Sequence, residues 1–127
     1  MSAGKSKVES YRDLTLWQKS IELVKQIYQL TLNFPADEKF GLVSQMRRAS
    51  VSIPSNIAEG QARRTTGDYV RFVSMAEGSL AELDTQLILS IELSYCTKTQ
   101  TRETFLIMAE VRKMLNALRL SLMTKIN

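Results

Sequence analysis

Arginine supplies most of the chemistry that this sequence offers. The 127 residues include no histidine and one cysteine, so the chain lacks histidine general bases, Ser-His and Cys-His nucleophile pairs and the usual ligand sets of zinc. Guanidinium groups bind phosphates and carboxylates in bidentate geometry. One segment holds five candidate nucleic-acid-binding residues of this type: Arg47, Arg48, Arg63, Arg64 and Arg71.

The positive charge of the chain is concentrated in this arginine-rich segment. Residues 39–71 carry six basic and two acidic side chains, an excess that equals the net charge of +4 of the whole chain. Such a segment predicts binding of RNA or DNA through phosphate contacts, with weak sequence selectivity and a steep salt dependence. An alternative stays open, in which the arginines form a solvated surface or the subunit contacts of a protein-protein scaffold that binds no nucleic acid.

A polar stripe runs beside an apolar stripe in the same segment. At 100° per residue the apolar stripe contains Met46, Ala49, Ile53 and Ile57, and the polar stripe contains Gln45, Ser52, Asn56 and Glu59. An enzymatic interpretation makes Glu59 a general acid or base, but no nucleophile or second carboxylate stands at a diagnostic spacing. We therefore interpret the polar stripe as a structural network between helices or subunits. We expect a non-enzymatic protein with no catalytic residue, metal, cofactor or small-molecule substrate.

The hydrophobic periodicity predicts four helices, over residues 14–33, 37–61, 67–95 and 101–125. Asp13 and Thr65 are the expected N-caps of the first and third, Asp37 or a neighbouring residue that of the second, and Thr99 or Thr101 that of the fourth. Long helices joined by short turns favour antiparallel neighbours. The predicted fold is therefore all-α, an up-down-up-down four-helix bundle over residues 11–127, preceded by a flexible tail over residues 1–10.

Three residues inside these helices need a structural reason. Pro54 removes a hydrogen bond to the Ser50 carbonyl and predicts a kink in the second helix. Gly78 is expected to allow close approach of another helix, whereas Gly60 is expected only to mark a helix end.

Apolar residues outnumber the positions that a small bundle core needs. Val43 and Val51 point away from the apolar stripe of the second helix, and Ile88, Leu89 and Ile91 spread over more than one face of the third, which predicts a second buried surface and hence a homo-oligomer. No apolar run approaches the roughly 18 residues that span a bilayer, so we expect no membrane partner. The lone cysteine and the polar N-terminus favour a cytoplasmic location.

Residues 42–60 also carry a family resemblance, because they read LVSQMRRASVSIPSNIAEG. This segment resembles the second helix of the four-helix bundle proteins encoded in intervening sequences of bacterial 23S rRNA genes. Residues 78–83, which read GSLAEL, and the opening of the first helix at residues 11–19 are similar too, so that the resemblance covers about residues 11–123.

The resemblance implies a fold and a general role. It implies a four-helix bundle that assembles into a ring-like homopentamer, and an accessory role in RNA or nucleic-acid biology without enzymatic activity. Distant relatives of similar fold include the accessory variability proteins of retroelements, which makes a role beside a reverse transcriptase a secondary expectation.

Overall fold

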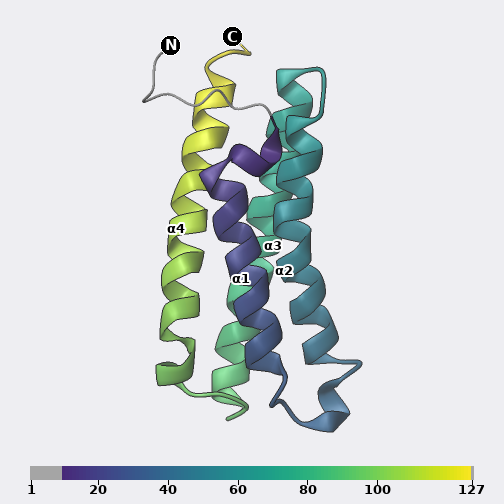
Figure 1. The fold of residues 1–127 in the computed structure, drawn as a ribbon, viewed down its shortest axis with the longest axis vertical. Coiled ribbons are helices and arrows are strands. Elements are labelled where there is room, and N and C mark those ends of the chain that lie inside the picture. The colour runs from purple at the N-terminus through teal and green to yellow at the C-terminus, as the bar shows by residue number, and fades with distance from the viewer. Residues whose placement is uncertain (1–9, 127) are drawn as a thin grey trace.

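The computed structural model describes residues 10–126 of the chain and contains only helices there. The elements are η1 (Tyr11–Asp13), α1 (Thr15–Thr31), η2 (Ala36–Glu38), α2 (Leu42–Gln61), α3 (Thr66–Glu92) and α4 (Lys98–Met123). Consecutive long helices run in opposite directions (Figure 1). The predicted all-α fold of four helices is confirmed. The expected flexible tail lies outside the described residues except for Ser10, which caps η1.

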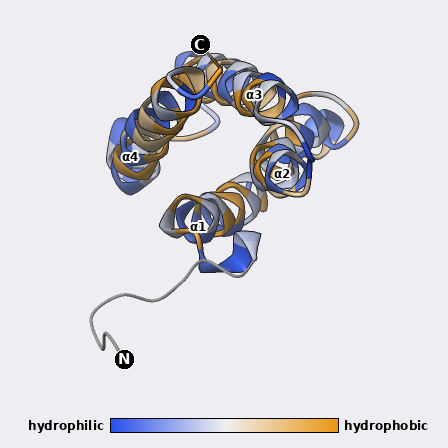
Figure 2. Ribbon diagram, turned by 90° about the horizontal axis from the view of Figure 1, so that it is seen from above, coloured by the Kyte–Doolittle hydropathy of each residue, from blue (hydrophilic) through white to orange (hydrophobic). Residues whose placement is uncertain are grey.

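The four long helices form a closed ring of contacts around one core. α1 packs against α2 and α4, and α3 packs against the same two helices, whereas within residues 10–126 the diagonal pairs bring no Cα atoms within 8 Å of each other. Figure 2 looks down this ring. Every helix contributes fully buried side chains, among them Leu23, Met46, Leu83 and Met108. The apolar stripe predicted for the second helix is buried, because its period matches the helix that forms.

The start of α1 differs from the predicted cap, whereas a neighbour of Asp37 caps the start of α2 as the alternative allowed. Asp13 belongs to η1, where its carboxylate accepts the Ser10 N–H at 3.2 Å, and α1 begins after it without a side-chain cap. Asp37 belongs to η2. The first turn of α2 is capped instead by Glu38, whose Oε1 accepts the Leu42 N–H at 3.0 Å.

The predicted cap of α3 is confirmed, and that of α4 is wrong. Thr65 caps α3 as predicted, and its hydroxyl accepts the Asp68 N–H at 3.1 Å. The prediction for α4 is wrong, because Thr97 is the N-cap and forms a reciprocal capping box with Gln100. The capping box begins the helix at Lys98, earlier than the apolar stripe alone suggested.

Pro54 lies buried within α2, which continues from Leu42 to Gln61. The Ser50 hydroxyl donates to the Arg47 carbonyl at 2.9 Å. The kink remains a prediction.

The close helix approach expected at Gly78 occurs at Gly60, which also lies next to the end of α2 as expected. A Cβ atom built on Gly60 would lie 2.9 Å from Phe72 Cβ and 2.9 Å from Tyr69 Cδ1, so that α3 approaches α2 closely at this glycine. A Cβ atom on Gly78 would have no neighbour within 4 Å. The predicted close approach at Gly78 is wrong, and it occurs at Gly60 instead.

The loop that leads into α2 is fastened to the end of α3. Tyr95 donates its hydroxyl to Glu38 Oε2 at 2.7 Å, and its ring lies 5.5 Å from that of Phe34. The Leu42 N–H and then the Tyr95 hydroxyl lower the pKa of Glu38. The hydrogen bond from the Tyr95 hydroxyl to Glu38 is the largest reason why the pKa of Tyr95 is raised. This link fixes the chain immediately before the arginine-rich helix.

Candidate nucleic-acid interface

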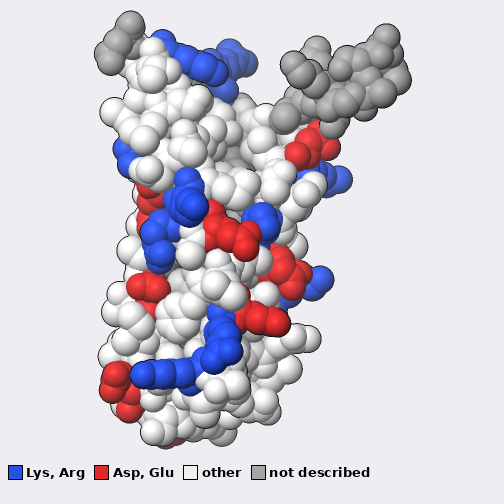
Figure 3. Space-filling view, turned by 90° about the vertical axis from the view of Figure 1, so that its left-hand side faces the viewer, with Lys and Arg blue, Asp and Glu red and all other residues white. Residues whose placement is uncertain are grey.

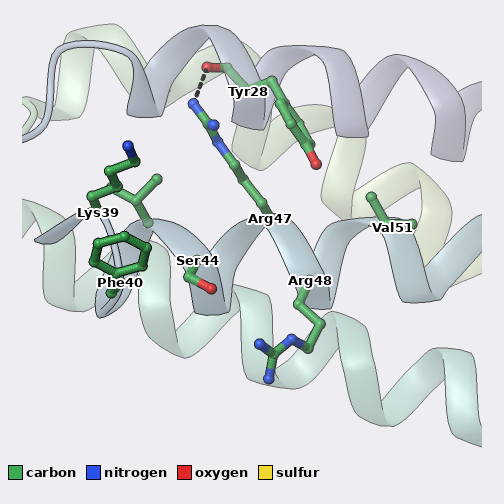
Figure 4. A pocket seen from close by; sticks show the side chains of 8 residues that line it. Tyr28, Lys39, Phe40, Ser44, Arg47, Arg48 and Val51 are labelled. Atoms are coloured by element: carbon green, nitrogen blue, oxygen red, sulfur yellow. Dashed lines mark hydrogen bonds between the residues drawn. The ribbon is translucent and has the colours of Figure 1, made fainter.

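Arg47 reaches across to α1 and acts as a strut between two helices. Its Nε donates to Thr31 Oγ1 at 3.0 Å, and a terminal nitrogen donates to the Tyr28 carbonyl at 3.4 Å (Figure 4). Its guanidinium carbon lies 4.5 Å from the centre of the Tyr28 ring. These contacts occupy much of the hydrogen-bonding capacity that a phosphate would use.

Arg48 points away from Arg47, as expected for neighbours about 100° apart on a helix (Figure 4). Its side chain is exposed and has no ion pair or hydrogen bond with any residue of the described chain. Glu59, a partner considered for Arg48, pairs with Arg63 instead. Arg48 is therefore available to a ligand or to another subunit.

An open cavity of about 490 Å³ lies between Arg48 and the loop before α2. Phe40 stands on its rim with 89% of its surface exposed, and the Lys39 ammonium lies 5.5 Å from its ring centre. Sequence reasoning missed Phe40 as a surface residue, because a phenylalanine before a helix is more often part of a core.

Arg63 and Arg71 meet at the other end of α2, over the ring of Phe72. Their guanidinium carbons lie 4.6 Å and 5.2 Å from the ring centre. Arg63 also pairs with Glu59 at 3.3 Å, and Arg71 pairs with Asp68 at 3.6 Å. All four charged side chains are 45–65% exposed, so these pairs are weak and exchangeable.

Arg64 is exposed in the turn between α2 and α3 and has no ion pair or hydrogen bond within residues 10–126. The turn therefore presents a group of three arginines, Arg63, Arg64 and Arg71, which we call the turn cluster. Arg48 lies thirteen residues before the end of α2 at Gln61, and hence about 20 Å away along the helix axis. The structure brings three of the five candidate arginines together and separates the other two from them.

The polar stripe of α2 is used only in part. Ser52 and Ser79 hydroxyls lie 2.8 Å apart and join α2 to α3, and Asn56 Nδ2 donates to the Ser52 carbonyl at 2.8 Å and to its hydroxyl at 2.9 Å. Within residues 10–126, Gln45 is exposed and makes no side-chain hydrogen bond, and Glu59 forms its ion pair with Arg63.

The α4 side of the bundle carries charges of both signs. Figure 3 shows basic and acidic side chains interspersed over this face. Lys19 pairs with Glu110, Arg119 pairs with Glu77 at 2.8 Å, and a third pair joins Arg112 to Asp84. Among residues 10–126, Arg48 and Arg64 on α2 and in its turn have no ion pair, and neither do Lys98, Arg102 and Lys113 on α4.

Metal-binding groups and membrane-spanning helices are both absent from the described residues. The described residues contain no group of acidic or cysteine side chains that would hold a metal ion. None of their helices is long and apolar enough to cross a membrane.

Comparisons with known proteins agree with the fold. The structure is similar to that of a protein of unknown function from the S23 ribosomal protein family of Bacteroides thetaiotaomicron, with a TM-score of 0.74 at 24% identity over 83% of this chain and 98% of that chain. No curated protein matches the sequence. The model of the 23S rRNA-intervening sequence protein family matches residues 12–117. Because this match spans most of the bundle, and the motif of residues 42–60 lies inside it, the chain belongs to the 23S rRNA-intervening sequence protein family.

Proposed function

We propose that this protein is a non-enzymatic, homo-oligomeric binding protein for RNA or other nucleic acid, which it contacts through the turn cluster. The observation that carries the proposal is the exposure of Arg64, without an ion pair or hydrogen bond among residues 10–126, beside Arg63 and Arg71. These arginines lie in the segment that holds the whole net charge of +4. The family description, which concerns rRNA genes, is consistent with such a ligand.

The cluster favours phosphates over bases. Phe72 is only 7% exposed and lies under two guanidinium groups, and Tyr69 is packed against Gly60. No aromatic ring of the cluster is thus free to stack on a nucleobase. Guanidinium contacts to phosphates give binding that depends on salt and little on sequence. In a homo-oligomer several copies of the cluster would act together, which raises the affinity of a modestly charged chain.

The test is fluorescence anisotropy with a hairpin RNA, a single-stranded RNA and a duplex DNA, each at two salt concentrations. Replacing Arg63 and Arg64 together by alanine is expected to weaken binding to all three probes and to flatten the salt slope by about one to two, because each lost phosphate contact contributes about 0.9. The matched control is Arg102→Ala with Lys113→Ala, which removes the same charge from exposed, unpaired positions on α4. Equal losses in both double variants, or no binding by the intact protein at low salt, would refute the proposal.

A protein-protein scaffold is the second candidate, and the exposure of Phe40 favours it. In this function the arginines serve subunit contacts, and the protein binds no nucleic acid. The same anisotropy titration then shows no binding at low salt, while Arg48→Ala lowers the mass of the assembly in light scattering.

A further inference from the structure

Two apolar surfaces lie on opposite faces of the bundle. On the α1/α2 face, Phe40 projects 89% exposed beside the cavity described above. On the α3/α4 face, a cavity of about 370 Å³ is lined by Ile88, Ile91 and Phe105. Because the helices contact one another in the ring order α1, α2, α3, α4, these two faces point away from each other.

Both surfaces lie at the same end of the bundle. Phe40 immediately precedes α2, while Ile88 and Ile91 occupy the last turns of α3, and Phe105 lies in the first turns of α4. Figure 1 shows these segments together at its lower end. Two copies placed side by side with parallel axes therefore bring the phenylalanine of one level with the cavity of the other.

The charges around the two surfaces are complementary. Asp37 and Lys39 flank Phe40, and Glu92 and Lys98 line the edge of the α3/α4 cavity. All four side chains are exposed, and none has an ion pair among residues 10–126. Each surface thus carries one acid and one base without an ion pair among residues 10–126.

The loop that carries Phe40 is held in a fixed position. Glu38 accepts hydrogen bonds from the Tyr95 hydroxyl at 2.7 Å and from the Leu42 N–H at 3.0 Å. A projecting side chain on a fixed loop loses little conformational freedom on docking. Inserting the exposed Phe40 side chain into a preformed cavity would therefore cost little conformational entropy.

We propose that Phe40 of one copy inserts into the cavity formed by Ile88, Ile91 and Phe105 of a second copy, with Lys39 pairing with Glu92 across the interface and Asp37 with Lys98. The proposal rests on the homo-oligomer of the proposed function and names its contact surface. Because the inserted residue and the cavity are different surfaces of one chain, the contact is heterologous. Each copy then uses both surfaces, and repeated contacts with one rotation close into a ring.

The test uses two exposed-site variants and their mixture. Light scattering of the full chain should give several times the protomer mass of 14.4 kDa. Phe40→Ser removes the inserted side chain and Ile88→Glu blocks the cavity, so each variant alone should be monomeric. An equimolar mixture still has one intact contact, between Phe40 of the Ile88→Glu chain and the cavity of the Phe40→Ser chain. It should therefore form a 1:1 complex of twice the protomer mass.

Controls separate this contact from general effects. Leu120→Ser changes a side chain that is 51% exposed at the other end of α4 and should leave the mass unchanged. Lys39→Glu should weaken the assembly, and addition of Glu92→Lys should restore it. Far-UV circular dichroism of every variant should show the wild-type helix content.

Several results would overturn the proposal. A monomeric wild-type protein would refute both this contact and the oligomer of the proposed function. Nucleic-acid binding by the turn cluster is then still tested by fluorescence anisotropy. An oligomer that Phe40→Ser leaves intact, or a mixture that stays monomeric, removes this contact alone. If Phe40→Ser leaves the mass unchanged but weakens RNA binding, Phe40 belongs to a nucleic-acid surface instead.

Discussion

Alanine substitutions at Gly60 and Gly78 should change stability in opposite directions. Both glycines lie inside long helices, and alanine is favoured over glycine there by about 1 kcal/mol. At Gly78 the new methyl group meets nothing within 4 Å. Gly78→Ala should therefore stabilise the protein by about 0.5–1 kcal/mol, chiefly by restricting the unfolded chain.

At Gly60 the same methyl group has no room. It would lie 2.9 Å from Phe72 Cβ, an atom that cannot rotate away because it is attached to the α3 backbone. Overpacking of this kind costs about 1–3 kcal/mol, which outweighs the helix-propensity gain. The expected net effect of Gly60→Ala is a destabilisation of about 1–2 kcal/mol.

Thermal melts followed by circular dichroism measure both effects. For a domain of this length 1 kcal/mol corresponds to about 3–5 °C in Tm, so the two variants should differ by about 5–12 °C. All melts are run at one protein concentration, because association itself shifts Tm. If Gly60→Ala raises Tm as much as Gly78→Ala does, the close approach of α2 and α3 at Gly60 is not rigid and the reasoning fails.

Three further perturbations test other contacts. Arg47→Ala should destabilise the bundle by about 1–2 kcal/mol in urea unfolding, because Arg47 donates two hydrogen bonds to α1. The adjacent Arg48→Ala should leave stability within about 0.5 kcal/mol of wild type. Equal effects would contradict the role of Arg47 as a strut between α2 and α1. Asn56→Ala should cost about 1 kcal/mol through its lost bonds to α2, and Glu59→Ala should be close to neutral because its pair with Arg63 is exposed. The pKa of Glu38 is lowered in the folded state, so its contribution to stability is present above the unfolded pKa of about 4.3 and is lost as the pH falls through the folded pKa. Glu38→Gln should therefore lower Tm at pH 7 and lose this deficit at pH 2–3; a deficit that does not depend on pH would contradict the role of the carboxylate.

The fold could be predicted because its main determinant is local. Met46, Ile53 and Ile57 recur at the helical period, and all three are fully buried. A side chain on the apolar side of an amphipathic helix is buried whichever neighbour covers it. The family motif in residues 42–60 adds the identity of the bundle, since it lies within the family match to residues 12–117.

The contacts between helices could not be predicted in the same way. Gly60 and Gly78 look alike in sequence, and only the path of α3 across α2 distinguishes them. The helical period predicted that Arg47 and Arg48 diverge, but it did not show that α1 lies on the side of Arg47. The sequence therefore predicted which arginines could bind a ligand. The structure shows that Arg47 is bonded to α1 and that the others differ in which neighbouring helices they face.

The division of the arginines along α2 has a functional consequence. Arg48 lies near the Phe40 end of α2, and the turn cluster lies beyond the other end, about 20 Å away. Sites this far apart with no shared partner contribute independently to free energy. Under the two proposals, substitutions near Phe40 change the mass of the assembly, and substitutions at Arg63 and Arg64 change the affinity of each protomer for phosphate. A monomeric Phe40→Ser protein should therefore keep the salt slope of a single protomer and lose only the gain in affinity that several linked copies provide.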